Sequence, residues 1–463
     1  MKKLFSYHGK RIKAKDKNLI TTMIVFTITL LFFLVTLLFY GKMLLEVDLD
    51  TVQLSDIRQL NIPYLIGSLS TAFFVCLVLL ILYFKYRIDS FKQLEHRQKL
   101  AQMVLQNKWY EAENIQNEGF FKDLPSKSKE KITHFPKMYY RMENGLIHIK
   151  VEIVMSKYQD QLLQLEKKLE AGLYCELVDK ELQDSFIVYT LLYDTIASRI
   201  QIDEVQANNG RLKLMKNLHW EYDKLPHMLI AGGTGGGKTY FILTIIEALL
   251  PTSANIYILD PKNADLADLE IVMPNQVFYR KEDMIDCIHA FYTAMLQRSE
   301  EMKKMPNYKT GENYAYVGLE ANFLIFDEYI AFMDMLGRES ADVISKLKQI
   351  VMLGRQAGFF LILACQRPDA KYLGDGIRDQ FNFRVALGRM SELGYGMMFG
   401  SDVDKQFFLK PIKGRGYVDV GTSVISEFYT PLVPKGYDFL ERIENLVLEK
   451  NKENETDTKE ESI

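Results

Sequence analysis

Three observations in the sequence predict the fold class, which is an α/β fold with a mostly parallel sheet in the second half of the chain, preceded by a transmembrane hairpin and a small α+β domain. A glycine-rich run, Gly232–Thr239, follows a short apolar segment and precedes a helical pattern. Further apolar segments then alternate with helical patterns, as in parallel sheets. Two long uncharged apolar stretches lie near the N-terminus, and they predict a transmembrane hairpin ahead of a small α+β domain.

The two apolar stretches run from Leu19 to Tyr40 and from Ile62 to Phe84, and neither contains a charged residue. A helix of about 20 apolar residues spans the hydrocarbon core of a bilayer. We therefore expect transmembrane helices at about residues 19–40 and 62–84. A cleaved signal peptide fits poorly, because the first run is long and a second follows. A helix buried in a soluble core remains the alternative.

Charge bias predicts the orientation of this hairpin. Basic residues lie on both flanks, namely Lys2, Lys3, Lys10, Arg11, Lys13, Lys15 and Lys17 before it and Lys85, Arg87, Lys92, Arg97 and Lys99 after it. The loop from Gly41 to Asn61 contains only Lys42 and Arg58 against several acidic residues. Because cytoplasmic flanks carry the excess of lysine and arginine, we expect both termini in the cytoplasm and the chain in the plasma membrane.

Residues 100–222 are expected to form a membrane-proximal α+β domain, after residues 1–99 with the hairpin. The pattern predicts a charged helix within 85–115, a linker at 122–131, a β-hairpin over 137–155, a helix over 157–171, and strands near 174–178, 186–192 and 212–215. The Asn144-Gly145 pair between apolar runs is a strong hairpin signal. No catalytic constellation is visible here, so we interpret this domain as a structural adaptor.

The glycine-rich run matches the phosphate-binding pattern G-x-x-x-x-G-K-[ST] without a mismatch. Its residues are Gly232, Gly233, Thr234, Gly235, Gly236, Gly237, Lys238 and Thr239, and Tyr240 opens the helix that follows. Glycines let backbone N–H groups turn toward a triphosphate, and the helix N-terminus favours an anion. Lys238 would contact the β and γ phosphates, and the Thr239 hydroxyl would bind Mg²⁺. ATP and Mg²⁺ are therefore the expected ligands, although a chance glycine-rich loop is the alternative.

A second apolar segment, Asn322–Phe326, ends in the carboxylates Asp327 and Glu328. In this pattern Asp327 would hold the Mg²⁺ shell, and Glu328 would orient or deprotonate the attacking water. The alternative is an acidic pair that begins a helix. Its position downstream of an intact P-loop favours the catalytic interpretation.

Two more apolar segments end in polar residues. Ile256–Leu259 leads into Asp260-Pro261-Lys262, and Phe359–Ala364 leads into Cys365-Gln366. Residues at the carboxyl ends of parallel strands face the ligand crevice of an open α/β sheet. Gln366 is therefore expected to sense the γ-phosphate or the attacking water. A fifth strand is expected at Phe383–Leu387.

Composition adds limits. The 463 residues are enough for two or three domains, and a formal net charge of −3 means that any DNA-binding surface must be local. The four cysteines form no C-x-x-C pair, which argues against a zinc site or a disulfide framework. Residues 436–463 are expected to form a C-terminal helix and, from Asn451 onward, an acidic disordered tail.

Several motifs resemble the FtsK/SpoIIIE family of DNA-pumping ATPases. They occur in the family's order and are Leu225–Gly232 leading into the P-loop, Asp260-Pro261-Lys262, Gly354–Gly358, Leu361–Pro368, Phe383–Leu387 and Gly414-Arg415-Gly416. The resemblance covers the motor alone and implies a RecA-like domain, at about residues 223–435, that works as a homohexameric ring. The family usually has hydroxyl side chains where this chain has Gly236 and Cys365.

The resemblance also implies an arginine that reaches the γ-phosphate of a neighbouring subunit. Arg384 and Arg355 lie in matching motifs, and the sequence does not choose between them; a surface or interface salt bridge is the alternative for each. A DNA-contacting pore implies further basic residues. Lys303, Lys304 and Lys309 are candidates, with a solvated loop as the alternative.

Two apolar spans, a compact adaptor and one motor look like the coupling proteins of Gram-positive conjugative plasmids and transposons. This resemblance implies an ATP-driven DNA translocase that delivers relaxase-bound DNA to the proteins of a type IV secretion-like channel. The alternatives are a chromosome-partitioning pump for double-stranded DNA and a protein-secretion ATPase. The family's cell-division members carry four spans, a long linker and a C-terminal winged-helix domain, which we do not expect in this chain.

Overall fold

The computed structural model describes most of the chain. The described residues are 9–46, 62–86, 88–115, 129–143, 145–153, 157–194, 196, 198–369, 371, 373–401, 403, 405, 407, 412–422 and 424–460. Most of the expected acidic loop, the start of the expected linker, Asn144 and the last three residues lie outside them. The chain divides into two compact units, residues 1–175 with 180–191 and residues 176–179 with 192–463.

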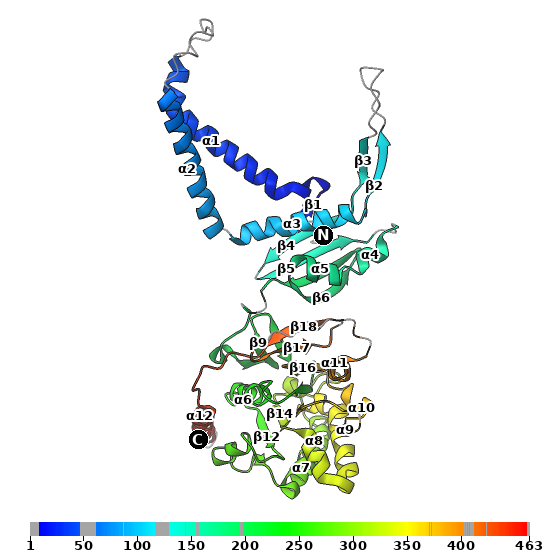
Figure 1. The fold of residues 1–463 in the computed structure, drawn as a ribbon. Helices are drawn as coiled ribbons and strands as arrows, with labels where there is room; N and C mark the ends of the chain where they lie inside the picture. The colour runs from blue at the N-terminus through cyan, green and yellow to red at the C-terminus, as the bar shows by residue number, and fades with distance from the viewer. Residues whose placement is uncertain are drawn as a thin grey trace. The chain divides into compact units, whose positions relative to one another are not determined.

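The N-terminal unit begins with two apolar helices, α1 (Leu19–Glu46) and α2 (Ile62–Tyr86), which contact each other (Figure 1). Within the described residues one helical stretch, Ala14–Leu38, is long and apolar enough to cross a membrane. None of its most apolar part is buried in the structure. The apolar stretch Ile66–Leu79 within α2 is shorter. Large side chains such as Phe26, Phe33 and Phe73 are exposed on these helices, a costly arrangement in water.

A five-stranded sheet follows, in the order β1-β4-β5-β7-β6; it belongs to this unit except for Glu176–Asp179 and Leu192. Its strands are β1 (Lys10–Ile12), β4 (Met138–Glu143), β5 (Leu146–Glu152), β6 (Glu176–Gln183) and β7 (Phe186–Leu192). The expected hairpin is confirmed, because Glu143 pairs with Leu146 and Gly145 adopts a positive φ of 77°. Buried residues alternate along β4 and β5, as expected for strands with one face on a core.

The helices of the N-terminal unit differ from the expected ranges. The charged helix is α3 (Ile88–Gln106), and it is followed by a separate pair of strands, β2 (Glu111–Ile115) and β3 (Lys129–His134). The helix expected over 157–171 is two helices, α4 (Gln159–Leu163) and α5 (Glu166–Leu173). His96, Leu100 and Val104 share one buried face of α3, and the His96 Nδ1 lies 3.0 Å from the Tyr140 hydroxyl.

The second unit contains a small antiparallel sheet and a large mixed one. The small sheet has the order β10-β9-β8, from β8 (Ala207–Asn208), β9 (Arg211–Met215) and β10 (Leu218–Glu221). The large sheet has the order β13-β12-β14-β15-β11-β16-β17-β18. Its strands are β11 (Met228–Gly232), β12 (Asn255–Leu259), β13 (Val277–Phe278), β14 (Asn322–Phe326), β15 (Phe359–Cys365), β16 (Phe383–Leu387), β17 (Arg415–Asp419) and β18 (Ile425–Tyr429).

All five expected strands of the motor are present, and they run parallel to their neighbours from β13 to β16. The sequence did not predict β13, or the antiparallel pair β17 and β18 that makes the sheet mixed. The helices of this unit are α6 (Lys238–Leu249), α7 (Lys281–Met302), α8 (Tyr329–Leu336), α9 (Ser340–Ala357), α10 (Asp375–Arg378), α11 (Glu392–Phe399) and α12 (Phe439–Glu460). Short 3₁₀ turns occur at η1 (Ala14–Asn18) in the first unit and at η3 (Ile202–Glu204), η4 (Ala267–Ile271), η5 (Tyr314–Val317) and η6 (Gly337–Glu339) in this one.

Helices cover both faces of the large sheet. On one face Ile230, Ile325 and Ile362 pack in a core with side chains of α6 and α12. On the other face their neighbours, such as Leu229 and Leu324, pack with α7, α8 and α9. Because the central strands β11, β14 and β15 are buried throughout, their sequences are continuous apolar runs instead of alternating ones.

The C-terminal segment differs from the expected disordered tail. Helix α12 continues through Asn451 to Glu460, which is the last described residue. Its second half is rich in glutamate and lysine and contains neither glycine nor proline, so its residues favour a helix despite the lack of apolar side chains. The amino-terminal half is anchored, because Ile443 and Leu446 are buried in the core with α6.

A buried histidine joins three elements of the large sheet. His227 directly precedes β11, its Nδ1 accepts the Leu361 N–H at 3.0 Å, and its Nε2 donates to the Val351 carbonyl at 3.0 Å. Burial lowers the pKa of His227 to about 3, and the bond to Val351 opposes this shift only in part. The neutral ring is therefore the form that the fold requires.

We expect the free energy of unfolding to decrease as the pH is lowered, because of His227. Its pKa in the fold lies below the ordinary 6.5, so its stabilising effect is complete above pH 6.5 and is lost as pH falls toward 3. The loss should approach about 1.4 kcal/mol per pH unit below 6.5. Thermal unfolding of the detergent-solubilised chain between pH 7.5 and 5 measures it.

The variant His227→Gln should melt at a lower temperature at pH 7.5 but with a flatter pH dependence. His289→Gln is the matched control, because that histidine is half-exposed and pairs with Asp342 on the surface. Equal pH slopes for wild type and His227→Gln would contradict this account.

Candidate active site

Four parallel strands deliver the candidate site residues to one edge of the large sheet. Phe326 of β14 pairs with Leu363 of β15, and Ala231 of β11 pairs with Cys365 of β15. Gly232 in turn pairs with Leu387 of β16. The segments that follow these strands therefore start side by side, and they contain Asp327 and Glu328, then Gln366, and then the P-loop.

The P-loop is a compact turn between β11 and α6. Gly235 and Gly237 have positive φ values of 78° and 97°, which only glycine adopts without strain. The Gly236 N–H donates to the Gly233 carbonyl at 3.0 Å, and the first turn of α6 begins at Lys238. This conformation matches the one that the glycine spacing predicts.

Two P-loop glycines pack against the backbone at the end of β16. A Cβ atom on Gly232 would lie 2.4 Å from the Leu387 carbonyl oxygen, and one on Gly236 would lie 2.9 Å from the same atom. A Cβ on Gly236 would also lie 3.0 Å from the Gly233 oxygen. The glycine at 236, where the resembling family has serine, therefore lets the loop sit close to β16.

The lysine of the P-loop is buried and bonded. The Lys238 Nζ donates to the Gly232 carbonyl at 2.7 Å and lies 3.4 Å from the Glu328 Oε1. A bound phosphate would replace the Gly232 carbonyl and the Glu328 carboxylate as the partners of Lys238. Lys238 and Glu328 are thus brought together, as the sequence predicted for residues of one site.

Asp327 is a buried carboxylate with an unsatisfied oxygen, because its Oδ1 has no hydrogen-bond partner among the described residues. Burial, with the nearby charges of Asp260 and Glu328, raises the pKa of Asp327 to about 6, although Lys238 and Lys262 act against this shift. A cation beside this oxygen would satisfy it and lower its pKa.

The residues present fit Mg²⁺. Within the described parts of the chain no group of three or more His, Cys, Asp or Glu side chains could hold a metal by itself. Mg²⁺ needs no such cage, because it is commonly held by one or two carboxylates together with substrate phosphates and water. Asp327, with its unpartnered oxygen, and Thr239, in the first turn of α6, are the side chains that would hold it.

Glu328 adopts an uncommon backbone conformation. It has a φ of 54° and a ψ of 54° at the start of α8, in the left-handed region that glycine favours. Its side chain, which is 12% exposed, lies 3.4 Å from the Lys238 Nζ and 3.5 Å from the Lys262 Nζ. Strain of this kind persists where the surroundings hold a residue in place, and it is common at active sites.

The other candidates lie in different environments. Gln366 is exposed directly after β15, while its neighbour Cys365 is fully buried, and burial raises the pKa of the Cys365 thiol to about 12. Tyr240 follows the P-loop and is 56% exposed. Its ring packs edge-on against that of Phe439 of α12, with 5.5 Å between the ring centroids. An exposed ring at this position is available to a nucleotide.

The two candidate arginines do not join these residues in the single chain. Arg384 is at the start of β16, and its guanidinium donates to the carbonyls of Phe381, Met398 and Arg378 at 2.6, 3.0 and 3.2 Å. Arg355 lies in the last turn of α9 with an exposed side chain. Arg384 therefore has a structural role in its own chain, whereas Arg355 faces solvent.

Sequence reasoning gave no role to Lys262, although it named the Asp260-Pro261-Lys262 segment. The available signal was its position just after an apolar strand, at the same edge as the P-loop. Arg389 is a second basic residue that was missed; it is exposed, and its carbonyl oxygen would lie 4.0 Å from a Cβ atom on Gly233.

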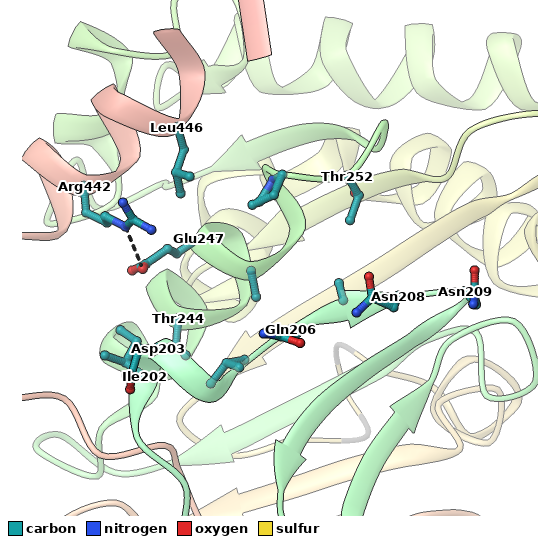
Figure 2. A pocket seen from close by; sticks show the side chains of 14 residues that line it. Ile202, Asp203, Gln206, Asn208, Asn209, Thr244, Glu247, Thr252, Arg442 and Leu446 are labelled. Atoms are coloured by element: carbon teal, nitrogen blue, oxygen red, sulfur yellow. Dashed lines mark ion pairs between the residues drawn. The ribbon is translucent and has the colours of Figure 1, made fainter. Parts of the chain in front are cut away.

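A separate pocket of about 630 Å³ lies behind the P-loop helix (Figure 2). No P-loop residue lines it; its walls are α6, the segment 202–209 and α12. Glu247 of α6 holds α12 here, because its Oε1 accepts the Tyr437 hydroxyl at 2.6 Å and lies 3.5 Å from the Arg442 Nε. These contacts connect the helix that begins at Lys238 with the C-terminal helix.

Comparisons with known proteins agree with this geometry. The model of the FtsK/SpoIIIE family matches residues 210–314. The Ftsk domain-containing protein YdcQ of Bacillus subtilis is 49% identical over 448 residues, which cover 96% of this chain and 92% of that protein. The chain belongs to the FtsK/SpoIIIE family. It is therefore a P-loop ATPase, and the resemblance seen in the sequence is confirmed.

Other known proteins are similar to parts of this chain. The DNA translocase FtsK of Chlorobaculum tepidum is 25% identical over 228 residues, or 45% of this chain and 26% of that protein. The ESX secretion system protein EccC of Thermomonospora curvata is 26% identical over 221 residues, or 44% of this chain and 16% of that protein. A solved structure of the pCW3 conjugation coupling protein TcpA with ATPgS is 18% identical, with a TM-score of 0.46, and covers 77% of this chain and 99% of that one.

We expect Gly236→Ala to weaken nucleotide binding by this FtsK/SpoIIIE member, because the new Cβ would press on the backbone of Leu387 and Gly233. Overpacking of this kind costs about 1–3 kcal/mol, so the Kd for a fluorescent ATP analogue should rise roughly tenfold. Gly233→Ala is the matched control, since its Cβ would meet nothing closer than 4.0 Å. Equal affinities for both variants would contradict the close packing described here.

Proposed function

We propose that this chain is a membrane-anchored, ATP-driven DNA translocase that acts as the coupling protein of conjugative transfer. In this role it would deliver relaxase-bound DNA to the proteins of a transfer channel. The observation that carries the proposal is the layout: apolar N-terminal helices, one small α+β unit and a single FtsK-type motor occur in one chain.

The motor would use ATP and Mg²⁺. The P-loop amides and Lys238 would hold the β and γ phosphates, Tyr240 lies where it could contact the nucleotide, and Thr239 and Asp327 would hold Mg²⁺. Mg²⁺ supplies charge neutralisation on the phosphate oxygens. Glu328 orients and deprotonates the attacking water, and Gln366, which follows the strand between β14 and β11, contacts the water or the γ-phosphate.

The N-terminal helices support a membrane anchor. Their large side chains are exposed in the structure, whereas one face of α2, with Ser68, Ala72 and Cys76, is buried. Small residues at such a face let membrane helices approach closely. We propose that α1 and α2 both span the plasma membrane, at about residues 19–40 and 62–84, with both termini in the cytoplasm.

The DNA substrate is proposed from the family. Relatives of the motor include proteins named DNA translocase FtsK. A chain with a net charge of −3 needs a local basic surface for DNA, and a homohexameric ring would gather one from six copies. Lys303, Lys304 and Lys309 remain candidates for this surface.

A protein-secretion ATPase is the second candidate, because the motor is also similar to EccC. The two functions differ in what stimulates ATP hydrolysis, DNA in one case and a secreted protein in the other. Loss of a partitioning pump would impair chromosome segregation and leave conjugative transfer intact, which distinguishes it from loss of a coupling protein.

A mating assay tests the proposal most simply. Deletion of the gene should abolish transfer of its mobile element, and wild type should restore it. Lys238→Ala should not restore transfer, because the phosphates lose the lysine that binds them. Glu328→Gln should still bind ATP, but it should hydrolyse ATP about 10²–10⁴-fold more slowly. Lys346→Ala, which removes a half-buried lysine of α9 that is paired with Asp342, is the control. Normal transfer with Lys238→Ala would overturn the proposal.

The two arginines should separate by phenotype. Arg384→Ala leaves three carbonyls without their donor, so we expect a lower melting temperature, at about 1–3 kcal/mol for each buried group. Arg355→Ala should leave the melting temperature unchanged and, if Arg355 acts across a subunit interface, lower kcat by roughly 10³-fold or more. An unchanged kcat for Arg355→Ala would remove Arg355 from the site.

A further inference from the structure

Lys262 lies beside the carboxylate that the proposed reaction depends on. It follows β12, whose last residue Leu259 pairs with Phe326, and Glu328 follows that same strand β14. The Asp327 N–H donates to the Leu259 carbonyl at 3.0 Å, which joins the two strand ends. The segments with Lys262 and Glu328 therefore leave the sheet together.

Asp260 holds the backbone of Lys262 in position. Its Oδ1 accepts the Lys262 N–H at 3.1 Å, and its Oδ2 accepts the N–H groups of Ala264 and Ala267 at 2.8 and 3.1 Å. The Asp260 side chain is fully buried, and Asn263 adopts a positive φ of 47° in this turn. A turn with these bonds presents the next side chain from a fixed point.

Glu328 lies between two lysines that have different surroundings. Lys238 is buried and is shared between Glu328 and the Gly232 carbonyl, whereas the Lys262 side chain is 44% exposed. A phosphate bound in the P-loop would draw Lys238 away from Glu328. Lys262 would remain, because its backbone is fixed by Asp260 and not by the P-loop.

We propose that Lys262 is a positioning residue that holds the Glu328 carboxylate in place for the attacking water. The inference rests on the proposed ATPase role of Glu328. Because the Lys262 side chain is 44% exposed, water screens this ion pair, which contributes about 0–1 kcal/mol to stability; the effect of removing Lys262 should therefore appear in the reaction. A fixed carboxylate is worth more than a mobile one, since misplacement by about 1 Å can cost roughly 10²-fold in rate.

The experiment compares three variants of the full-length protein in detergent. Lys262→Met keeps the aliphatic stem but removes the charge, and we expect kcat for ATP to fall about tenfold or more, while the Kd for a fluorescent ATP analogue with Mg²⁺ changes less than about twofold. Lys262→Arg should recover most of kcat, because it restores the charge. Lys346→Met, which removes a half-buried lysine of α9 that is paired with Asp342, should match wild type.

A double variant tests whether Lys262 acts through Glu328. If it does, Glu328→Gln with Lys262→Met should hydrolyse ATP no more slowly than Glu328→Gln alone in single-turnover measurements. Additive losses would assign Lys262 to another step, and a large rise in Kd would make it a phosphate ligand; either result overturns the inference. An unchanged kcat for Lys262→Met also overturns it, whereas a wild type without ATPase activity would defeat the proposed function itself.

Discussion

Charge balance at one edge of the large sheet is the constraint on which the site depends. Three carboxylates, Asp260, Asp327 and Glu328, lie there with little exposure, and Lys238 and Lys262 are the cations that offset them. Burial, together with the like charges of Asp260 and Glu328, raises the pKa of Asp327. A cation would complete the arrangement, and a magnesium ion with a triphosphate would bring both charge and ligands to it.

The fold makes this crowding possible. Because β12, β14, β15, β11 and β16 run parallel, each delivers its carboxyl end to the same edge. Apolar helices cover both faces of these strands, so the strand ends are rigid and the polar residues after them start from fixed positions. Glycine at 232 and 236 then lets the P-loop lie directly on the end of β16.

Much of this arrangement could be predicted from the sequence, because its signals are local. The P-loop, the strand before Asp327 and the Asn-Gly hairpin each depend on residues that are close in the chain. The antiparallel strands β17 and β18 and the length of α12 were missed, since their pairing and anchoring come from distant partners such as β16 and Glu247.

Within the site, too, the sequence predicted which segments take part but not the contacts that decide the role of each residue. Sequence motifs named Lys262 and Arg384, but only the fold shows that the first reaches Glu328 and that the second donates to carbonyls of its own chain. The choice of Gly236 in place of serine also became intelligible only through its distance to Leu387. Contacts between segments far apart in the chain decide these roles, and a motif does not contain them.

The central claim is that ATP hydrolysis at this edge moves DNA. The most direct test places the full-length protein in lipid nanodiscs and measures release of streptavidin from the end of biotinylated DNA, single- or double-stranded. We expect ATP-dependent release with at least one form of DNA, together with faster ATP hydrolysis in its presence. Hydrolysis that neither form of DNA stimulates, without release of streptavidin, would contradict the claim.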